Sequence, residues 1–141
     1  MGIRLGTQAV PDEVQRRQDE DPEFQKRLKG LNFSLILVGT DDSEHHDWQY
    51  SIKFENGNIT EQELVRQPAP SELRELTFNK KKYDVKVVGN HQDVYEFVSG
   101  KLDISSMLTK VKIEGDFGKF MNQMKGFEDF IDFLQSMDFE P

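Results

Sequence analysis

Three histidines and a dense group of acidic residues are the side chains in this sequence that come nearest to a chemical site. His45 and His46 lie in the stretch DDSEHHD, and His91 lies further along the chain. Imidazoles and carboxylates together are common metal ligands, so this stretch is one candidate for a cation site. Adjacent histidines on a strand or hairpin point to opposite sides, however, and no second group of ligands has the spacing to complete the site. We therefore favour a solvated hairpin tip without a metal, and a position beside a helix cap for His91.

The motifs of common catalytic and phosphate-binding sites are missing. The sequence contains no GxSxG, HExxH, P-loop or GxGxxG motif. It has no cysteine, which excludes thiolate catalysis and cysteine-ligated zinc. The two glycines around Asp116 in EGDFGK lack the spacing of a phosphate cradle, and this segment is predicted to be a strand end, a turn and a helix cap. We predict a protein that is not an enzyme, with no catalytic residue, no cofactor and no metal.

The net charge and the hydrophobic pattern of the chain argue against several classes of binding partner. A chain of 141 residues fits one domain, 1–141. Its formal net charge of −8 argues against nucleic acid and allows at most transient contact with an anionic membrane. No apolar run approaches the roughly 18 residues that a membrane span needs. The start of the chain does not resemble a secretory signal, which together with the absence of cysteine favours the cytoplasm.

The first 30 residues are predicted to be mainly helical. Residues 1–10 show no periodicity and are expected to form a loose leader. Pro11 and the acids after it are typical of a helix start, and Asp21 followed by Pro22 repeats that pattern. Gly30 then ends the second helix. We expect two short helices that meet near residue 21.

Four later segments alternate between apolar and polar residues with a period of two. They are 33–37, 48–55, 83–88 and 110–115. Such alternation indicates strands that are buried on one face only, so helices should cover one face of the sheet. A fifth strand is expected within 60–80, where ITEQELVRQ fits either a strand or a short helix. Residues 76–82 are a candidate for half of a hairpin with the strand at 83–88.

The second half of the chain is predicted to add three helical segments. NHQDVYEFVSG has a capping Asn90, apolar residues at helical spacing and a terminating Gly100. ISSML is expected to be a short helical turn. The closing stretch, 117–139, holds six of the eleven phenylalanines and three of the five methionines. We predict that its helix breaks at Gly126, because glycine destabilises a helix interior by roughly 1 kcal/mol.

The excess apolar surface of this closing helix has three interpretations. It is plain core, the wall of a ligand site, or a patch through which two copies associate. Phe130, Phe133 and Met137 lie on a strip beside the main apolar stripe, so a homodimer contact would use these three residues.

Three ordered segments resemble the sterol carrier protein type-2 family. VYEFVSGKLDISSMLTKVKIEGDF (94–117) is similar to the family's aromatic helix, its SGKLD segment and the strand that ends in GD. WQYSIKFENG and KKYDVKVVGNHQDVYEFVSG resemble the tryptophan-bearing strand and the strand that leads into the helix. The likeness covers about residues 24–135. The connection at 58–82 is longer than usual for the family, and the chain lacks the peroxisomal tripeptide of some members, which suggests a stand-alone prokaryotic-like form.

The resemblance implies an α+β fold, with a five-stranded, mostly antiparallel sheet, helices on one face and an apolar tunnel between the two layers. It also implies non-catalytic binding or transfer of a lipid, such as a fatty acid or fatty acyl-CoA. The alternative is an accessory or scaffold domain that presents lipid-like intermediates to a partner enzyme. The residues expected to contact the lipid are Leu35, Ile52, Phe54 and Val87 from the strands, Phe97, Met107 and Leu108 from the middle helices, and Phe117, Phe120, Met121, Met124, Phe127, Phe130 and Ile131 from the closing helix.

Overall fold

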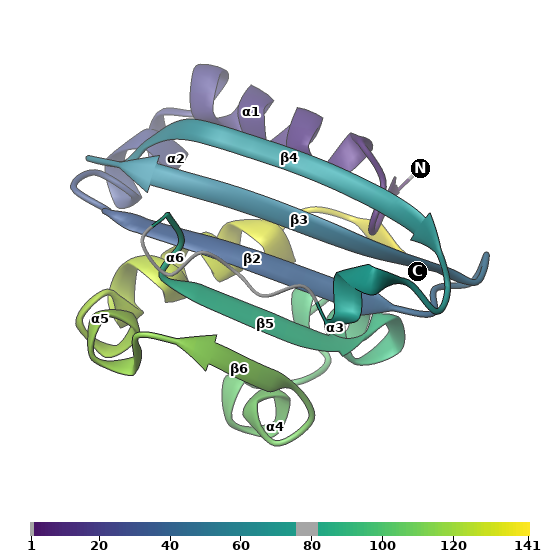
Figure 1. The fold of residues 1–141 in the computed structure, drawn as a ribbon. Helices are drawn as coiled ribbons and strands as arrows, with labels where there is room; N and C mark the ends of the chain where they lie inside the picture. The colour runs from purple at the N-terminus through teal and green to yellow at the C-terminus, as the bar shows by residue number, and fades with distance from the viewer. Residues whose placement is uncertain (1, 76–81) are drawn as a thin grey trace.

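The protein folds as a sheet covered on one face by helices, in a computed structural model that describes residues 2–75 and 82–141 and all their side chains except that of Phe117 (Figure 1). The elements, in chain order, are β1 (Ile3–Arg4), α1 (Ala9–Glu20), α2 (Pro22–Arg27), β2 (Phe33–Thr40), β3 (His46–Glu55), β4 (Asn58–Pro68), the 3-10 helix η1 (Glu72–Arg74), β5 (Val85–Asn90), α3 (His91–Val98), α4 (Ile104–Leu108), β6 (Lys112–Gly115), α5 (Phe117–Asn122), α6 (Met124–Gln135) and β7 (Phe139–Glu140).

The main sheet has five strands in the order β4-β3-β2-β5-β6. β2 and β5 run parallel, whereas the other three neighbouring pairs are antiparallel. The predicted α+β fold with a mostly antiparallel, five-stranded sheet is therefore confirmed. The fifth strand is β4, so ITEQELVRQ is strand and not helix. The turn after β3 places Asn56 and Gly57 at φ 52° and 80°, the left-handed region that these two residue types tolerate best.

All four predicted strands differ from their expected bounds, because pairing, and not local alternation, sets where a ladder ends. β2 and β3 cover 33–40 and 46–55 instead of 33–37 and 48–55. β5 covers 85–90 instead of 83–88, since its last residues Gly89 and Asn90 pair with Gly39 and Thr40 of β2. β6 covers 112–115 instead of 110–115, because only these four residues pair with β5. The hairpin half expected at 76–82 lies, apart from its last residue, outside the described residues.

Two of the helices, α2 and α3, begin at capping residues that the sequence predicts. The Asp21 carboxylate accepts hydrogen bonds from the backbone N–H groups of Glu23 (3.0 Å) and Phe24 (3.4 Å), so α1 and α2 meet at this residue. The Asn90 side chain accepts from the N–H of Asp93 at 2.8 Å and starts α3. Such caps satisfy N–H groups that have no partner inside the helix. These two predicted helix starts are confirmed, whereas α1 begins at Ala9, two residues before the start expected at Pro11.

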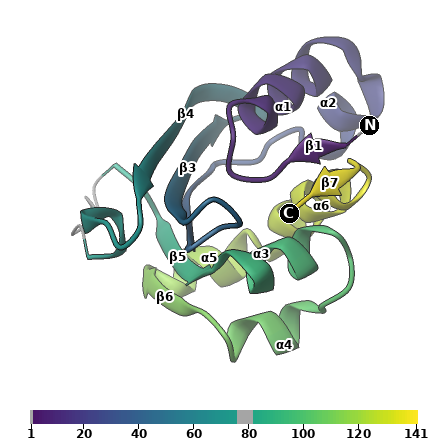
Figure 2. The ribbon, with the colours of Figure 1, turned by 90° about the vertical axis from the view of Figure 1, so that its right-hand side faces the viewer.

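The α-helices lie on one face of the sheet, as the one-sided alternation predicts (Figures 1 and 2). The opposite face is not bare, however. Ile36 and Val38 of β2 point to it and are buried together with Leu73 of η1. β2 is the central strand and is apolar on both faces, so a segment had to cover its outer side.

The expectation of a loose leader at 1–10 is wrong. β1 pairs in parallel with β7, which places Ile3 beside Phe139 and Arg4 beside Glu140 (Figure 2). Leu5 is buried in the main core. The two ends of the chain thus form a small sheet of their own. No local pattern could indicate this pairing, because two residues per strand are too few to show a period.

The closing helix is broken, but not at Gly126. α5 ends at Asn122 and α6 begins at Met124, so the break falls at Gln123. Gly126 lies inside α6, where a Cβ would lie 2.5 Å from Cδ1 of the buried Leu31. The glycine is therefore explained by close packing of α6 on the loop before β2, and not by a bend.

Candidate ligand-binding site

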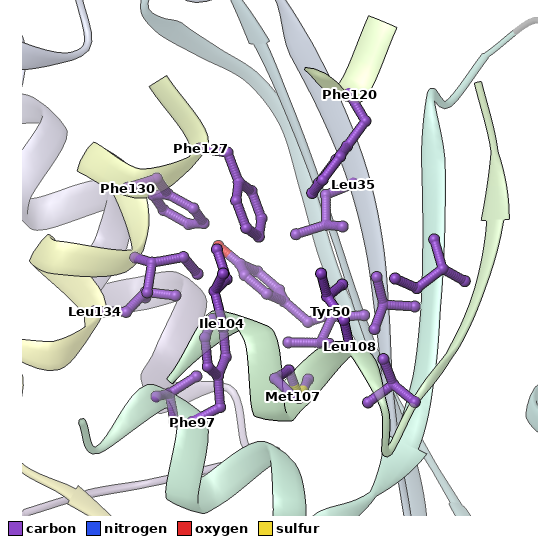
Figure 3. Close-up of a pocket in the computed structure, with 16 residues that line it drawn as sticks. Leu35, Tyr50, Phe97, Ile104, Met107, Leu108, Phe120, Phe127, Phe130 and Leu134 are labelled. Atoms are coloured by element: carbon purple, nitrogen blue, oxygen red, sulfur yellow. The ribbon is translucent and has the colours of Figure 1, made fainter. Parts of the chain in front are cut away.

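An apolar cavity lies between the sheet and the helices, where strands β2, β3, β5 and β6 face α3, α4, α5 and α6 (Figure 3). It leaves about 40 Å³ for the centres of water-sized spheres within about 590 Å³ of space between atoms, part of which is open to solvent. Its walls expose apolar atoms only. They are formed by Leu35, Leu37, Tyr50, Val87, Phe97, Val98, Ile104, Met107, Leu108, Val111, Ile113, Phe120, Phe127, Phe130, Ile131 and Leu134.

Nine of the fourteen side chains expected to contact a lipid line this cavity. These nine are Leu35, Val87, Phe97, Met107, Leu108, Phe120, Phe127, Phe130 and Ile131. They come from strands and helices that are far apart in the sequence, and the fold brings them together. Their contact with a ligand stays a prediction.

Four other predicted side chains lie away from the cavity walls. Ile52 and Phe54 are buried in the core at the far end of β3, where the Phe54 ring packs against the Phe130 ring at a centroid distance of 5.3 Å. Met121 is 62% exposed, and Met124 packs against the edge of the core. These two were assigned to one helical stretch that continues to Gly126, whereas the helix already breaks between them, at Gln123. The fifth, the side chain of Phe117, lies outside the described residues.

Seven wall residues were missed by the sequence reasoning. Leu37 and Tyr50 carried a usable signal, since each alternates in phase with a predicted neighbour on the same strand. The others belong to a short helix, an edge strand or the flank of a longer helix, where single-sequence periodicity says little about which side faces a cavity. The seven are Leu37, Tyr50, Val98, Ile104, Val111, Ile113 and Leu134.

The three residues proposed for a homodimer contact lie in the chain's own core. Phe130, Phe133 and Met137 are each buried to 93% or more. Phe133 packs against the ring of Phe24 at 4.9 Å, which brings α6 against α2. Phe133 therefore packs against α2, and Phe130 packs against Phe54 at the end of β3. These side chains pack inside one chain, so they are not exposed for a contact between two copies.

Tyr50 carries the one polar group among the described side chains that line the cavity. Its hydroxyl donates a hydrogen bond to Oε1 of Gln62 at 2.6 Å. Burial raises the pKa of this phenol well above its usual range, so Tyr50 is neutral. The hydroxyl is thus engaged within the protein, and the cavity offers hydrocarbon contact and little else.

The hairpin between β2 and β3 is less solvated than predicted. His45 is exposed and lies 3.1 Å from the Asp41 carboxylate. Asp42 and Asp47, by contrast, are buried, and Asp42 forms an ion pair with Arg66 at 2.8 Å. Within the described ranges, no three histidine, aspartate or glutamate side chains gather as a metal site requires. Asp42 and Glu44 thus connect the hairpin to Arg66 of the neighbouring strand β4.

His91 directly follows the Asn90 cap, as predicted, and is also buried. Its Nδ1 accepts a hydrogen bond from Nε1 of Trp48 at 3.0 Å, and the Trp48 ring is held between Gly6 and Gly39. A Cβ at Gly39 would lie 2.3 Å from the indole. Since Nδ1 accepts, the neutral ring carries its proton on Nε2, which is buried and lacks a hydrogen-bond partner among the described residues.

Acid should destabilise the protein through His91. Burial lowers the pKa of His91; Asp42 opposes this, and Arg4 and Arg66 add to it. The unfolded chain therefore takes up a proton near the ordinary pKa of about 6.5 while the folded chain does not. We expect the stability of the wild type to fall, as pH drops below about 6.5, more steeply than that of His91→Gln. Urea unfolding at about pH 7.5 and about pH 5.5 measures this. Equal pH dependence in the two proteins would contradict it.

The fold is similar to that of solved sterol carrier proteins. A conserved hypothetical protein from Thermus thermophilus, described as a possible sterol carrier protein, has a TM-score of 0.70 and 15% identity, over 99% of this chain and 94% of that one. A crystal structure of sterol carrier protein 2 also has a TM-score of 0.70, with 14% identity over 95% and 99% of the two chains. The sterol carrier protein domain 2 of Helicoverpa armigera has a TM-score of 0.50 and 14% identity, over 91% and 87%.

These similarities confirm the resemblance at the level of the fold. No protein-family model and no curated protein sequence matches the chain. Identities near 15% show a shared fold and not a shared ligand. Within the described residues, no helix is both long enough and apolar enough to cross a membrane. The function must therefore be argued from the cavity itself.

Proposed function

We propose that the protein binds a single-chain hydrophobic ligand, such as a fatty acid or the acyl chain of a fatty acyl-CoA, in the cavity between sheet and helices, without catalysis. The observation that carries this proposal is the wall, which exposes apolar atoms only and is assembled from four strands and four helices. A catalytic site needs polar groups that converge on the reacting atoms, and the one polar side chain among the described wall residues is engaged with Gln62.

Burial of hydrocarbon would drive binding. Each methylene removed from water contributes about 0.8 kcal/mol, so affinity depends on chain length and not on directional contacts. The wall contains Met107 and several phenylalanines, and Met adapts to irregular shapes through its three rotatable bonds. Such a site would accept related chains and discriminate weakly among head groups.

The cavity must widen to admit a chain. About 40 Å³ for sphere centres is room for roughly three waters, since one water needs about 10–15 Å³. The element best placed to move is α4, a helix of five residues whose Leu108 lines the cavity and is 42% exposed. We place the entrance at this helix, with the chain entering past Leu108 while its polar end stays in water.

Two measurements on the purified protein test the function. Mass spectrometry of a solvent extract should find lipids with a single acyl chain. After delipidation, a fluorescent fatty acid should bind with one site per chain and be displaced by an unlabelled fatty acid but not by acetate, which has the same head group and no long hydrocarbon chain. Absence of bound lipid together with absence of uptake would overturn the proposal.

A further inference from the structure

A second, smaller cavity shares part of its wall with the first. It leaves about 10 Å³ for sphere centres within about 290 Å³ between atoms, space for about one water. Four side chains line both cavities: Leu37, Tyr50, Val98 and Leu134. Beyond them the second cavity is lined by Leu5, Gly6, Val10, Trp48, Leu64 and Phe139. None of its described wall residues is exposed, whereas the first cavity includes the exposed Leu108. We call the two the outer and the inner chamber.

Tyr50 is the fixed part of the boundary between the chambers. The three other shared side chains are aliphatic, whereas Tyr50 presents an aromatic ring and is held at its far end. Its hydroxyl donates to Oε1 of Gln62 at 2.6 Å, and Nε2 of Gln62 donates to the backbone carbonyl of Pro11 at 3.0 Å. The ring is thus tied through β4 to α1. Swinging it aside would break a partly buried hydrogen bond, which is unfavourable.

We propose that the Tyr50 ring closes the inner chamber to the ligand and so determines the longest acyl chain that the protein can bury. The proposal rests on the proposed function and adds a length limit to it. A chain that enters past Leu108 with its methyl end first fills the outer chamber until the methyl group reaches Tyr50. Longer chains must leave their additional methylenes in water.

A limit on chain length can be measured as a change in how affinity depends on the length of the acyl chain. Each methylene that the outer chamber buries should tighten binding about fourfold, the equivalent of about 0.8 kcal/mol. Beyond the limiting length, affinity should stop rising. A plot of log Kd against chain length for saturated fatty acids that differ by two methylenes should therefore show a break, and the break should lie at the same length for any head group.

The test compares the wild type with Tyr50→Leu, which removes the ring and the tie to Gln62. We expect the break to move to a chain longer by at least two methylenes, so that the first chain beyond the wild-type limit gains about tenfold or more in affinity. Tyr50→Phe keeps the ring but loses the tie to Gln62, so its break should move less than that of Tyr50→Leu. Leu64→Ala is the matched control, because it enlarges the inner chamber alone and should leave the break unchanged.

Trp48, the single tryptophan of the chain, gives an independent readout because it lines the inner chamber and not the outer one. A fatty acid that carries bromine on its terminal carbon quenches tryptophan fluorescence on contact. Bound at saturation, this probe should leave Trp48 of the wild type unquenched and should quench it in Tyr50→Leu. Far-UV circular dichroism of the same samples checks that each variant is folded.

The outcomes separate the two proposals. If the wild type binds fatty acids but the bromine already quenches Trp48, or if Tyr50→Leu leaves the break in place, the length limit is wrong and the binding function stands. If the folded wild type binds no member of the series, both are wrong.

Discussion

Replacing Asp47 with alanine is expected to lower the free energy of unfolding by about 3 kcal/mol. The Asp47 side chain has no exposed surface and accepts five hydrogen bonds. They come from the N–H of Asp41, from the N–H and hydroxyl of Ser71, and from Nε and Nη2 of Arg74, at 2.7–3.0 Å. The carboxylate thus joins the β2–β3 hairpin to the segment that carries η1. Its removal leaves the donors of five partly buried hydrogen bonds without an acceptor.

The contribution of Asp47 to the free energy of unfolding should be lost in acid. Burial alone would raise the pKa of Asp47, but the hydrogen bonds from Arg74, Ser71 and the Asp41 backbone hold it well below its usual range. A carboxyl with a lowered pKa stabilises the fold above the ordinary value of about 3.9 and loses that effect as pH falls below it. The difference between wild type and Asp47→Ala in urea unfolding should therefore be full at neutral pH and shrink below about pH 4.

Asp19→Ala serves as the control, because Asp19 is exposed on α1 and its carboxylate accepts a hydrogen bond from the side chain of Gln15 on the same helix. It should change stability by less than about 0.5 kcal/mol. Asp47→Asn keeps the shape but offers one acceptor oxygen in place of two, so an intermediate loss is expected. If Asp47→Ala were as mild as Asp19→Ala, the contacts between hairpin and η1 would not contribute to stability.

The sheet could be predicted from the sequence because its signal is local. In β3 the apolar residues Trp48, Tyr50, Ile52 and Phe54 alternate with polar ones, and all four are buried in the main core. Capping residues are equally local, which is why Asp21 and Asn90 were placed correctly. A single sequence is enough to predict an element whose conformation is determined by residues adjacent to it in the chain.

The features that could not be predicted depend on partners far away in the chain. Ile3 pairs with Phe139, and Gly126 is explained by its contact with Leu31. Periodicity likewise shows which face of a strand is buried but not how far along the strand a cavity extends. This is why Ile52 and Phe54 were chosen as wall residues, whereas Tyr50, in phase with both, lies at the cavity.

Filling the outer chamber should abolish most of the binding without unfolding the protein. Val87 of β5 is small, buried and part of the cavity wall, and its change to phenylalanine adds about four carbon atoms to the space that a ligand would occupy. If the new ring excludes about four methylenes, binding weakens by about 3 kcal/mol, roughly a hundredfold. Stability should change by less than about 1 kcal/mol, because the ring occupies space that is already present.

Val88→Phe is the matched control, since the next residue on the strand points to the opposite face of the sheet, where Val88 packs half-buried against Ile36, Val38 and Leu73. It adds the same bulk on the same strand but leaves the cavity untouched, so fatty-acid affinity should match the wild type. Competition with a fluorescent fatty acid measures binding, and urea unfolding measures stability. Equal affinity in Val87→Phe and Val88→Phe, with both folded, would place the ligand elsewhere. A loss confined to Val87→Phe would locate the hydrocarbon chain between β5 and the helices that cover it.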